Sequence, residues 1–178
     1  MASIRLTEVQ ARPTANLTLT AALGFDKAQY TQSVANAGYA LGLSPVPYLV
    51  KSGDPLPTPR WTVALGAEYG WRVADNPAFL RADYQFASAY DRTGSAGTQT
   101  YDPDTRRTGT LRLVNLRTGV KVGAWDWSLY LKNAFDARTR MSRFHSYSQS
   151  IVTGAPSPLY YDQALPPRTL GASANVKF

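Results

Sequence analysis

The sequence contains repeated segments in which apolar and polar residues alternate, and this period of two residues predicts β-strands. Residues 61–73 show it most clearly, because Val63, Leu65 and Ala67 alternate with smaller or polar residues. No segment has the 3.6-residue period of an amphipathic helix, so we expect few helices. Seven predicted strands cover residues 3–11, 17–25, 61–73, 78–86, 113–122, 127–132 and 169–178.

The connections between the predicted strands are alternately short and long. The short turns lie at residues 12–16, 74–77 and 123–124, and the long connections at residues 31–59, 87–109 and 137–166. In an antiparallel meander, all turns then lie at one end and all long loops at the other, as in outer-membrane β-barrels. A Greek-key sandwich would not sort its loops in this way. Residues 1–178 are therefore expected to form one all-β unit, an antiparallel up-and-down meander of about seven strands that is part of a transmembrane β-barrel.

Composition excludes several other classes. Mean hydropathy is −0.28 and no run of about 18 apolar residues exists, which excludes transmembrane helices but not barrel strands of about ten alternating residues. Cysteine is absent, so disulfides and thiolate sites are excluded. The net charge is +7, but the basic residues are scattered singly, so we expect no nucleic-acid partner.

The alternation itself leaves two interpretations of the faces open. In a soluble sandwich the aliphatic residues would fill a dry interior, whereas in a wide barrel they would face lipid. The barrel interpretation places Arg81, Arg117 and Lys132 on a concave, wet face. On the convex, lipid-type face it places Val63, Leu65, Leu80, Leu116, Val120, Leu129 and Val176.

Aromatic residues favour the barrel interpretation because they gather near both ends of the predicted strands. Lipid interfaces favour such belts of Trp and Tyr. At the turn end we expect Trp71, Trp125, Trp127 and Phe178. At the loop end we expect Phe25, Tyr30, Trp61 and Tyr90.

Motifs near the C-terminus resemble a known family. The final segment alternates up to Phe178, and a last amphipathic strand that ends on Phe is typical of outer-membrane barrels. Asn115-Leu116-Arg117, the run from Trp127 to Asp136, Pro167-Arg168-Thr169-Leu170-Gly171 and Val176-Lys177-Phe178 resemble the last three strands of TonB-dependent receptors. Ala134 replaces the usual Leu. Residues 11–19, and Pro59-Arg60 at the start of a strand, resemble the preceding part of such a barrel.

The resemblance implies a barrel of 22 strands in the Gram-negative outer membrane, plugged by an N-terminal domain. Such a receptor imports ferric siderophores or similar nutrients with energy delivered through TonB. The chain resembles the C-terminal third, with no plug domain, TonB-contacting segment or signal peptide. Its expected partners are therefore the lipid bilayer, the remaining barrel and plug, TonB only through the absent N-terminal part, and a siderophore or other nutrient. The edges near Leu6 and Val176 are expected to lack their natural partner strands.

Two alternatives to the receptor interpretation remain. A stand-alone β-sheet module would bind a ligand or partner through its long loops without transport. An outer-membrane hydrolase would need a Ser/His/Asp constellation that cannot be assembled from this sequence. The single histidine, His145, has no second His or Cys as a partner, and Asp102-Pro103-Asp104 is typical of a turn. We therefore expect no catalytic residue, cofactor site or metal site.

Arginines in the last two long connections are the candidate ligand contacts. Exposed guanidinium groups bind anionic ferric chelates or lipopolysaccharide phosphates by bidentate hydrogen bonds. The simpler interpretation, which we favour, is ordinary solvated loop charge. The six residues are Arg92, Arg106 and Arg107 in one connection and Arg138, Arg140 and Arg143 in the next.

Overall fold

The computed structural model describes residues 3–36, 47–149 and 156–177, and these residues form strands and connections without a helix. Seven strands make the main sheet. They are β1 (Ser3–Thr14), β2 (Leu17–Lys27), β5 (Trp61–Val73), β6 (Asn76–Ala87), β7 (Leu111–Val122), β8 (Trp125–Lys132) and β11 (Thr169–Val176). Phe178, the expected end of the last strand, lies outside the described residues.

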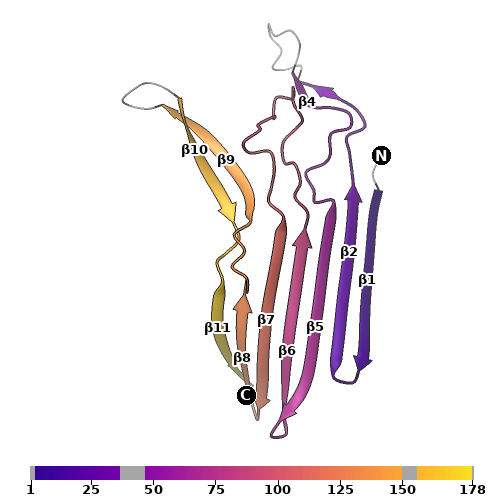
Figure 1. Ribbon diagram of the computed structural model, residues 1–178, viewed down its shortest axis with the longest axis vertical. Helices are drawn as coiled ribbons and strands as arrows, with labels where there is room; N and C mark the ends of the chain where they lie inside the picture. The colour runs from indigo at the N-terminus through magenta and orange to yellow at the C-terminus, as the bar shows by residue number, and fades with distance from the viewer. Residues whose placement is uncertain (1–2, 37–46, 150–155, 178) are drawn as a thin grey trace.

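The main sheet is a simple antiparallel meander. Its strand order is β1-β2-β5-β6-β7-β8-β11, and every neighbouring pair is antiparallel. The strands stand side by side, with the short turns at the lower end in Figure 1 and the long connections at the upper end. The predicted seven-stranded meander is confirmed, and so is the sorting of the connections by length.

Two of the turns have the geometry that tight hairpins require. Ala74 and Asp75 both have positive φ, 45° and 68°, as in a type I′ turn. Gly123, with φ 60°, occupies the first position of the other turn, as in type II′. The strands reach further into the turns than predicted, because Pro77 already belongs to β6. Pro77 pairs with Arg72 of β5 but has no partner in β7, whose pairing with β6 begins at Ala78. It therefore stands at the start of the strand, a position that tolerates proline.

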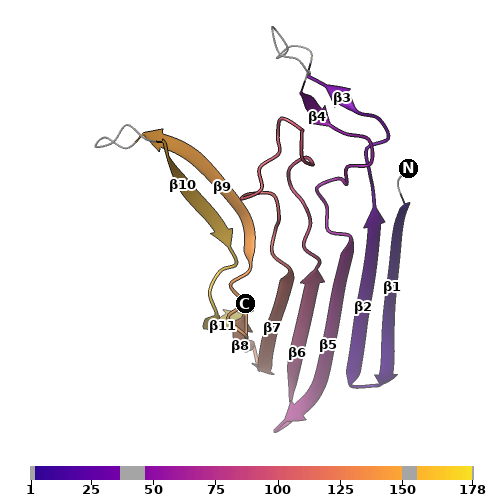
Figure 2. The same ribbon diagram turned by 45° about the horizontal axis from the view of Figure 1, so that its top comes forward.

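Two small hairpins lie in the long connections and were not predicted. The first pairs β3 (Val34–Ala35) with β4 (Tyr48–Val50), and the second pairs β9 (Arg140–Gln149) with β10 (Pro156–Ala164). The second hairpin leans away from the upper end of β8 and β11 (Figure 2). Its polar and aromatic residues do not separate into an apolar and a polar face, so the hydropathy pattern did not reveal it.

The described residues lack a hydrophobic core. Ala78 is their only buried apolar residue, and no large side chain is fully buried. A sheet normally buries one face against a second layer, as the two sheets of a sandwich do. The soluble-sandwich interpretation, with the aliphatic residues in a dry interior, therefore disagrees with the structure of the described chain.

The sheet is open at both edges. β1 and β11 stand at opposite ends of the strand order, so each has one side without a partner strand among the described residues. Every residue of β1 is exposed. Because seven strands alternate in direction, the first and the seventh run the same way. The expected open edges near Leu6 and Val176 are present.

Candidate functional site

The register divides the main sheet into an apolar and a polar face, because directly opposed residues lie on the same face. One row runs through Ala21, Leu65, Tyr84 and Val114. The seven aliphatic residues predicted to share a face do so, and Arg81, Arg117 and Lys132 lie on the other. We call these the apolar face and the polar face. The larger aliphatic residues of the apolar face are Val9, Leu17, Leu19, Leu23, Val63, Leu65, Val73, Leu80, Val114, Leu116, Val120, Val122, Leu129, Leu131, Leu170 and Val176.

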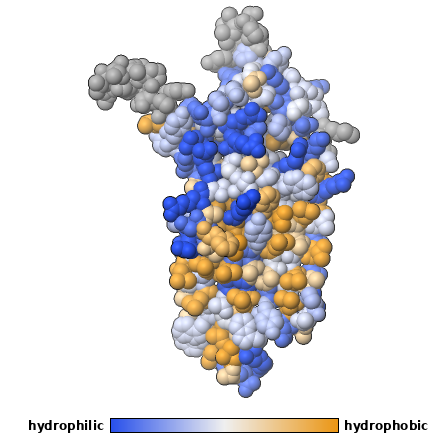
Figure 3. Space-filling model, viewed as in Figure 1, coloured by the Kyte–Doolittle hydropathy of each residue, from blue (hydrophilic) through white to orange (hydrophobic). Residues whose placement is uncertain are grey.

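The apolar face is largely uncovered by the described residues. Leu65 is 46% exposed, Leu129 56% and Leu170 77%. Figure 3 shows hydrophobic residues forming a band across the strands, with mainly hydrophilic residues beyond it at the loop end. Folded soluble monomers rarely expose an apolar patch of this extent. β1 departs from this division into an apolar and a polar face, because the register places its apolar residues Ile4 and Leu6 on the polar face.

Aromatic side chains lie at both ends of the apolar face. At the turn end, the rings of Trp125 and Trp127 stack 5.6 Å apart. At the loop end, Phe25 and Trp61 pack with ring centroids 4.6 Å apart. Trp71 lies near the turn end of β5, two residues before its last residue. Tyr30 and Tyr90 lie in the connections at the loop end. The predicted positions of these aromatic residues are therefore confirmed, apart from Phe178.

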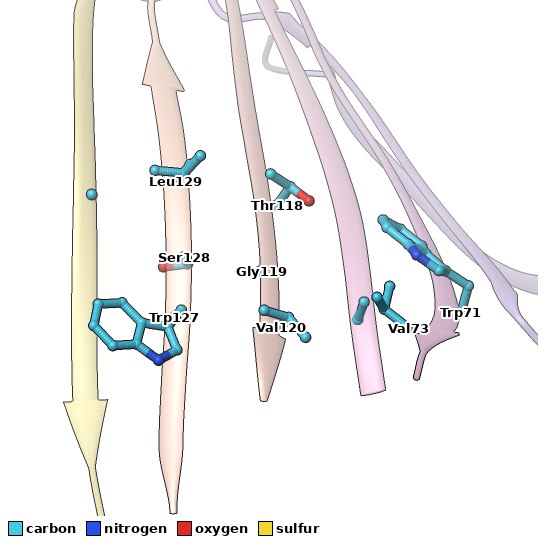
Figure 4. Close-up of a pocket in the computed structure, with 10 residues that line it drawn as sticks. Trp71, Val73, Thr118, Gly119, Val120, Trp127, Ser128 and Leu129 are labelled. Carbon is cyan, nitrogen blue, oxygen red and sulfur yellow. The ribbon is translucent and has the colours of Figure 1, made fainter. Parts of the chain in front are cut away.

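A shallow apolar groove lies on the turn-end half of this face (Figure 4). Trp71 of β5 and Trp127 of β8 stand on opposite sides of it, with Val120 of β7 between them. The groove encloses about 310 Å³, and its lining is predominantly apolar. The groove could hold an apolar chain such as a lipid tail, but none of its lining residues carries a charged group that could act in catalysis.

The polar face carries a hydrogen-bonded network in place of an apolar surface. Arg81 pairs with Asp83 on its own strand at 2.8 Å and with Glu68 of β5 at 3.4 Å. Arg117 donates to Ser128 Oγ at 3.1 Å, and Ser128 contacts Ser173 at 2.8 Å. Arg81 and Asp83 thus neutralise one another on this face.

Two rings on the polar face cover glycines of the neighbouring strand. A Cβ added at Gly119 of β7 would lie 2.7 Å from the ring of Phe79 in β6. A Cβ added at Gly171 of β11 would lie 2.3 Å from the ring of Tyr130 in β8. Only glycine lets an aromatic ring lie this close to the backbone of the next strand, a known way of stabilising glycines in sheets.

Most of the six candidate arginines have partners within the loops. Arg106 and Arg107 share Asp91, at 2.7 and 3.7 Å. The Arg92 guanidinium lies 4.5 Å from the centre of the Phe144 ring.

The third connection shows the same pattern. Arg143 forms a two-pronged pair with Asp162, and Arg138 pairs with Asp136 at 3.0 Å. For Arg140, the described residues show no ion pair. Arg107 and Arg138 keep the most accessible side chains, 71% and 82% exposed. The six arginines therefore do not converge on one site, and their contact with a ligand stays a prediction.

One cluster joins the second long connection to the β9–β10 hairpin, and we call Asp102, Asp104, His145 and Tyr160 the loop latch. His145 Nε2 lies 2.5 Å from Asp102 Oδ2. The Tyr160 hydroxyl donates to Asp104 Oδ2 at 3.0 Å, and the Tyr160 ring stacks on His145. His145 and Asp102–Asp104, which seemed separate in the sequence, thus meet in one structure. Tyr160 was missed because its role depends on the unpredicted hairpin.

The latch favours the charged form of Asp102. Burial alone would raise the pKa of this carboxyl, but hydrogen bonds from Thr105, the Asp104 backbone and His145 outweigh burial and lower it. In Tyr160, the bond to Asp104 and burial both raise the pKa of the phenol. The lowered pKa of Asp102 favours its acceptor form, and the raised pKa of Tyr160 favours its donor form, as the two hydrogen bonds require.

Within the described residues, no group of three or more His, Cys, Asp or Glu side chains is arranged to hold a metal ion. Those residues also include no helix long and apolar enough to cross a membrane. The features that remain for function are the apolar face, the polar face and the latched loops.

Comparison with known proteins gave no relative. No family model matches the chain, and neither a curated protein nor a solved structure matches it significantly.

Proposed function

We propose that the chain is part of a transmembrane β-barrel of the TonB-dependent receptor type in a Gram-negative outer membrane. In this role it contributes barrel wall and ligand-facing loops to the uptake of ferric siderophores or similar nutrients. The observation that carries the membrane part of the proposal is the continuous, exposed apolar face of the sheet, on which no second layer of described residues packs. The receptor type rests on the C-terminal motifs alone.

Lipid is the covering that best fits the apolar face. Barrel strands need about 9–11 tilted residues to cross the hydrocarbon layer, and β1, β2, β5, β6 and β7 have 11 to 13. Aromatic residues at both ends of the apolar face match the two membrane interfaces. The polar face, with its Arg81 and Arg117 networks, would then face the barrel lumen.

Closure of such a barrel requires further strands between β11 and β1. An antiparallel barrel needs an even number of strands, whereas this sheet has seven. The remainder must therefore contribute an odd number of strands. A second copy in the same membrane orientation does not meet this condition, because β11 and the copy's β1 would run parallel. We assign this role to the remaining barrel of the same receptor, which would also contain the plug and the contact with TonB.

The absence of native cysteine allows a direct test of the lipid contact. Leu65→Cys and Leu129→Cys place a fluorophore on the apolar face, and Ala64→Cys and Gln85→Cys place it on the polar face. After refolding into liposomes, lipid-borne quenchers should quench the first pair of labels strongly and the second pair weakly. Equal quenching of both pairs, or a folded monomer in water without detergent, would contradict the membrane proposal.

Uptake needs its own test. A receptor completed with its remaining strands and plug should bind a ferric chelate, and Arg107→Gln together with Arg138→Gln should weaken binding of an anionic chelate. A completed receptor that binds no ferric chelate or similar nutrient would contradict the uptake role while leaving the membrane proposal standing.

A further inference from the structure

The charged residues of the apolar face occupy only one of its ends. Among the paired positions of the main sheet, the register gives this face three charges, Arg5, Lys27 and Arg112, and no acidic residue. Arg5 lies opposite Phe25, and Arg112 opposite Phe86. All three lie near the loop end of β1, β2 or β7. We call them the basic rim.

The rim side chains are available to an external partner. Arg5, Lys27 and Arg112 are exposed, and none forms an ion pair with another described residue. They differ in this respect from Arg81 of the polar face and Arg143 of the hairpin, both of which are paired with carboxylates. A cation in the hydrocarbon layer is costly, but its cost falls to nearly zero at the interface, so the loop end is where lipid-facing cations are tolerated.

The turn end of the same face has a different character. Its paired positions include Val73, Val122, Trp125 and Val176, none of which is charged. At the paired positions of the apolar face, the turn end is therefore uncharged and the loop end carries three cations. Arg12 lies at the turn end of β1 but has no register partner.

We propose that the basic rim binds the phosphate groups of anionic lipids in the membrane leaflet on the loop side. This inference rests on the proposed function, because it requires the apolar face to lie in a bilayer. Guanidinium groups bind phosphate through paired hydrogen bonds, and lysine binds it as a point charge. Charge complementarity selects the partner, because a neutral leaflet would leave three cations at the interface without counter-charges. The loop-side leaflet should therefore be the more anionic of the two.

The test compares two variants that lose the same charge from different places. R5Q/K27Q/R112Q removes the rim. K121Q/K132Q/K177Q removes two lysines of the polar face and one that follows β11. The full chain is refolded into vesicles of phosphatidylcholine alone or mixed with phosphatidylglycerol, and its partitioning and tryptophan emission are measured.

The wild-type chain should prefer the anionic vesicles, and the rim variant should lose most of that preference. A cation near an anionic surface strengthens binding by about fivefold, so three together account for a factor on the order of 100. The control variant should keep most of the preference, and added salt should reduce it in the wild type.

The outcomes separate the two proposals. Equal loss in the two variants would show that net charge alone drives the preference and would overturn the inference, while insertion of both into either vesicle would leave the membrane proposal standing. No blue shift of tryptophan emission in any vesicle would mean that the apolar face does not enter lipid, and both proposals would fall.

Discussion

At the scale of single residues, adjacent positions of one strand face different surroundings. Leu65 belongs to the apolar face and is 46% exposed, whereas Ala64 points to the polar face and lies opposite Gln85. The same substitution at these two neighbours therefore tests the surroundings of each face without changing the strand or its composition.

We expect Leu65→Arg to destabilise the lipid-embedded chain by about 2–4 kcal/mol, the cost of a cation deep in the lipid-facing surface of a barrel. Ala64→Arg should cost much less because the polar face already holds Arg81, Glu68 and Asp83. Urea titration of both variants in liposomes measures the difference. Similar losses of stability at the two positions would argue against lipid contact.

The six loop arginines illustrate why residue type alone does not identify a binding site. In the sequence, the six loop arginines look equivalent. In the structure, the Arg143 guanidinium is held by Asp162, whose carboxyl has its pKa lowered chiefly by that hydrogen bond. Arg107 and Arg138 keep exposed side chains, so they are the arginines to vary when a ligand is sought.

At the scale of elements, the β9–β10 hairpin is held to the second long connection by the loop latch. Outside the latch, Arg92 also reaches the hairpin, with its guanidinium over the Phe144 ring and Nη1 3.5 Å from the Arg143 carbonyl oxygen. The charged groups of the hairpin are Arg140, Arg143 and Asp162. Those of the connection are Asp91, Arg92, Asp102, Asp104, Arg106 and Arg107.

Docking of this hairpin should weaken in acid. The docked state lowers the pKa of Asp102, so its contribution is present above the ordinary aspartate value of about 3.9 and is lost as pH falls through the lowered value. Hydrogen exchange of β9 amides, read at pH values above and below 4, should show protection lost on acidification.

Asp102→Asn provides the control for this prediction. It removes the charge that responds to pH but keeps a hydrogen-bonding side chain, so protection should be lower near neutral pH and less dependent on acid. If β9 keeps its full protection in the variant at all pH values, Asp102 does not hold the hairpin.

At the scale of the whole molecule, strand number and direction constrain assembly. Among the described residues, β1 and β11 form the two edges of the sheet without a further partner strand, and both run the same way. Open edges leave backbone donors and acceptors without partners, and each such group costs several kcal/mol in hydrocarbon. The single chain should therefore aggregate or associate with other chains in detergent rather than form a closed monomeric pore.

A tandem duplicate of the chain tests the parity argument. It has an even number of strands, but closing it would require β11 of the first copy to pair in parallel with β1 of the second. We expect neither the single nor the tandem chain to show the heat-modifiable migration of a closed monomeric barrel. A tandem chain that migrates in this way and admits small solutes would refute the parity argument.

The sequence alone determined the positions of the seven main strands, their alternating short and long connections, and the division of each strand into two faces. These properties are local, because successive side chains of a strand point to opposite sides whatever surrounds them. The ends of the strands were predicted less accurately, because they depend on pairing between strands. Pro77, for example, is typical of a turn, but in the structure it pairs with Arg72 of β5.

Only the tertiary structure decided whether the described residues cover each face and which loop residues come together. Alternation is the same for a buried and an uncovered apolar face, and the exposed Leu129 and Leu170 separate the two cases. The pairing of Asp102 with His145 joins residues 43 positions apart, so no local pattern contains it. In the sequence, the residues of the basic rim are isolated cations within alternating segments. The register across the strands is needed to show that they share one face and lie at one end of it.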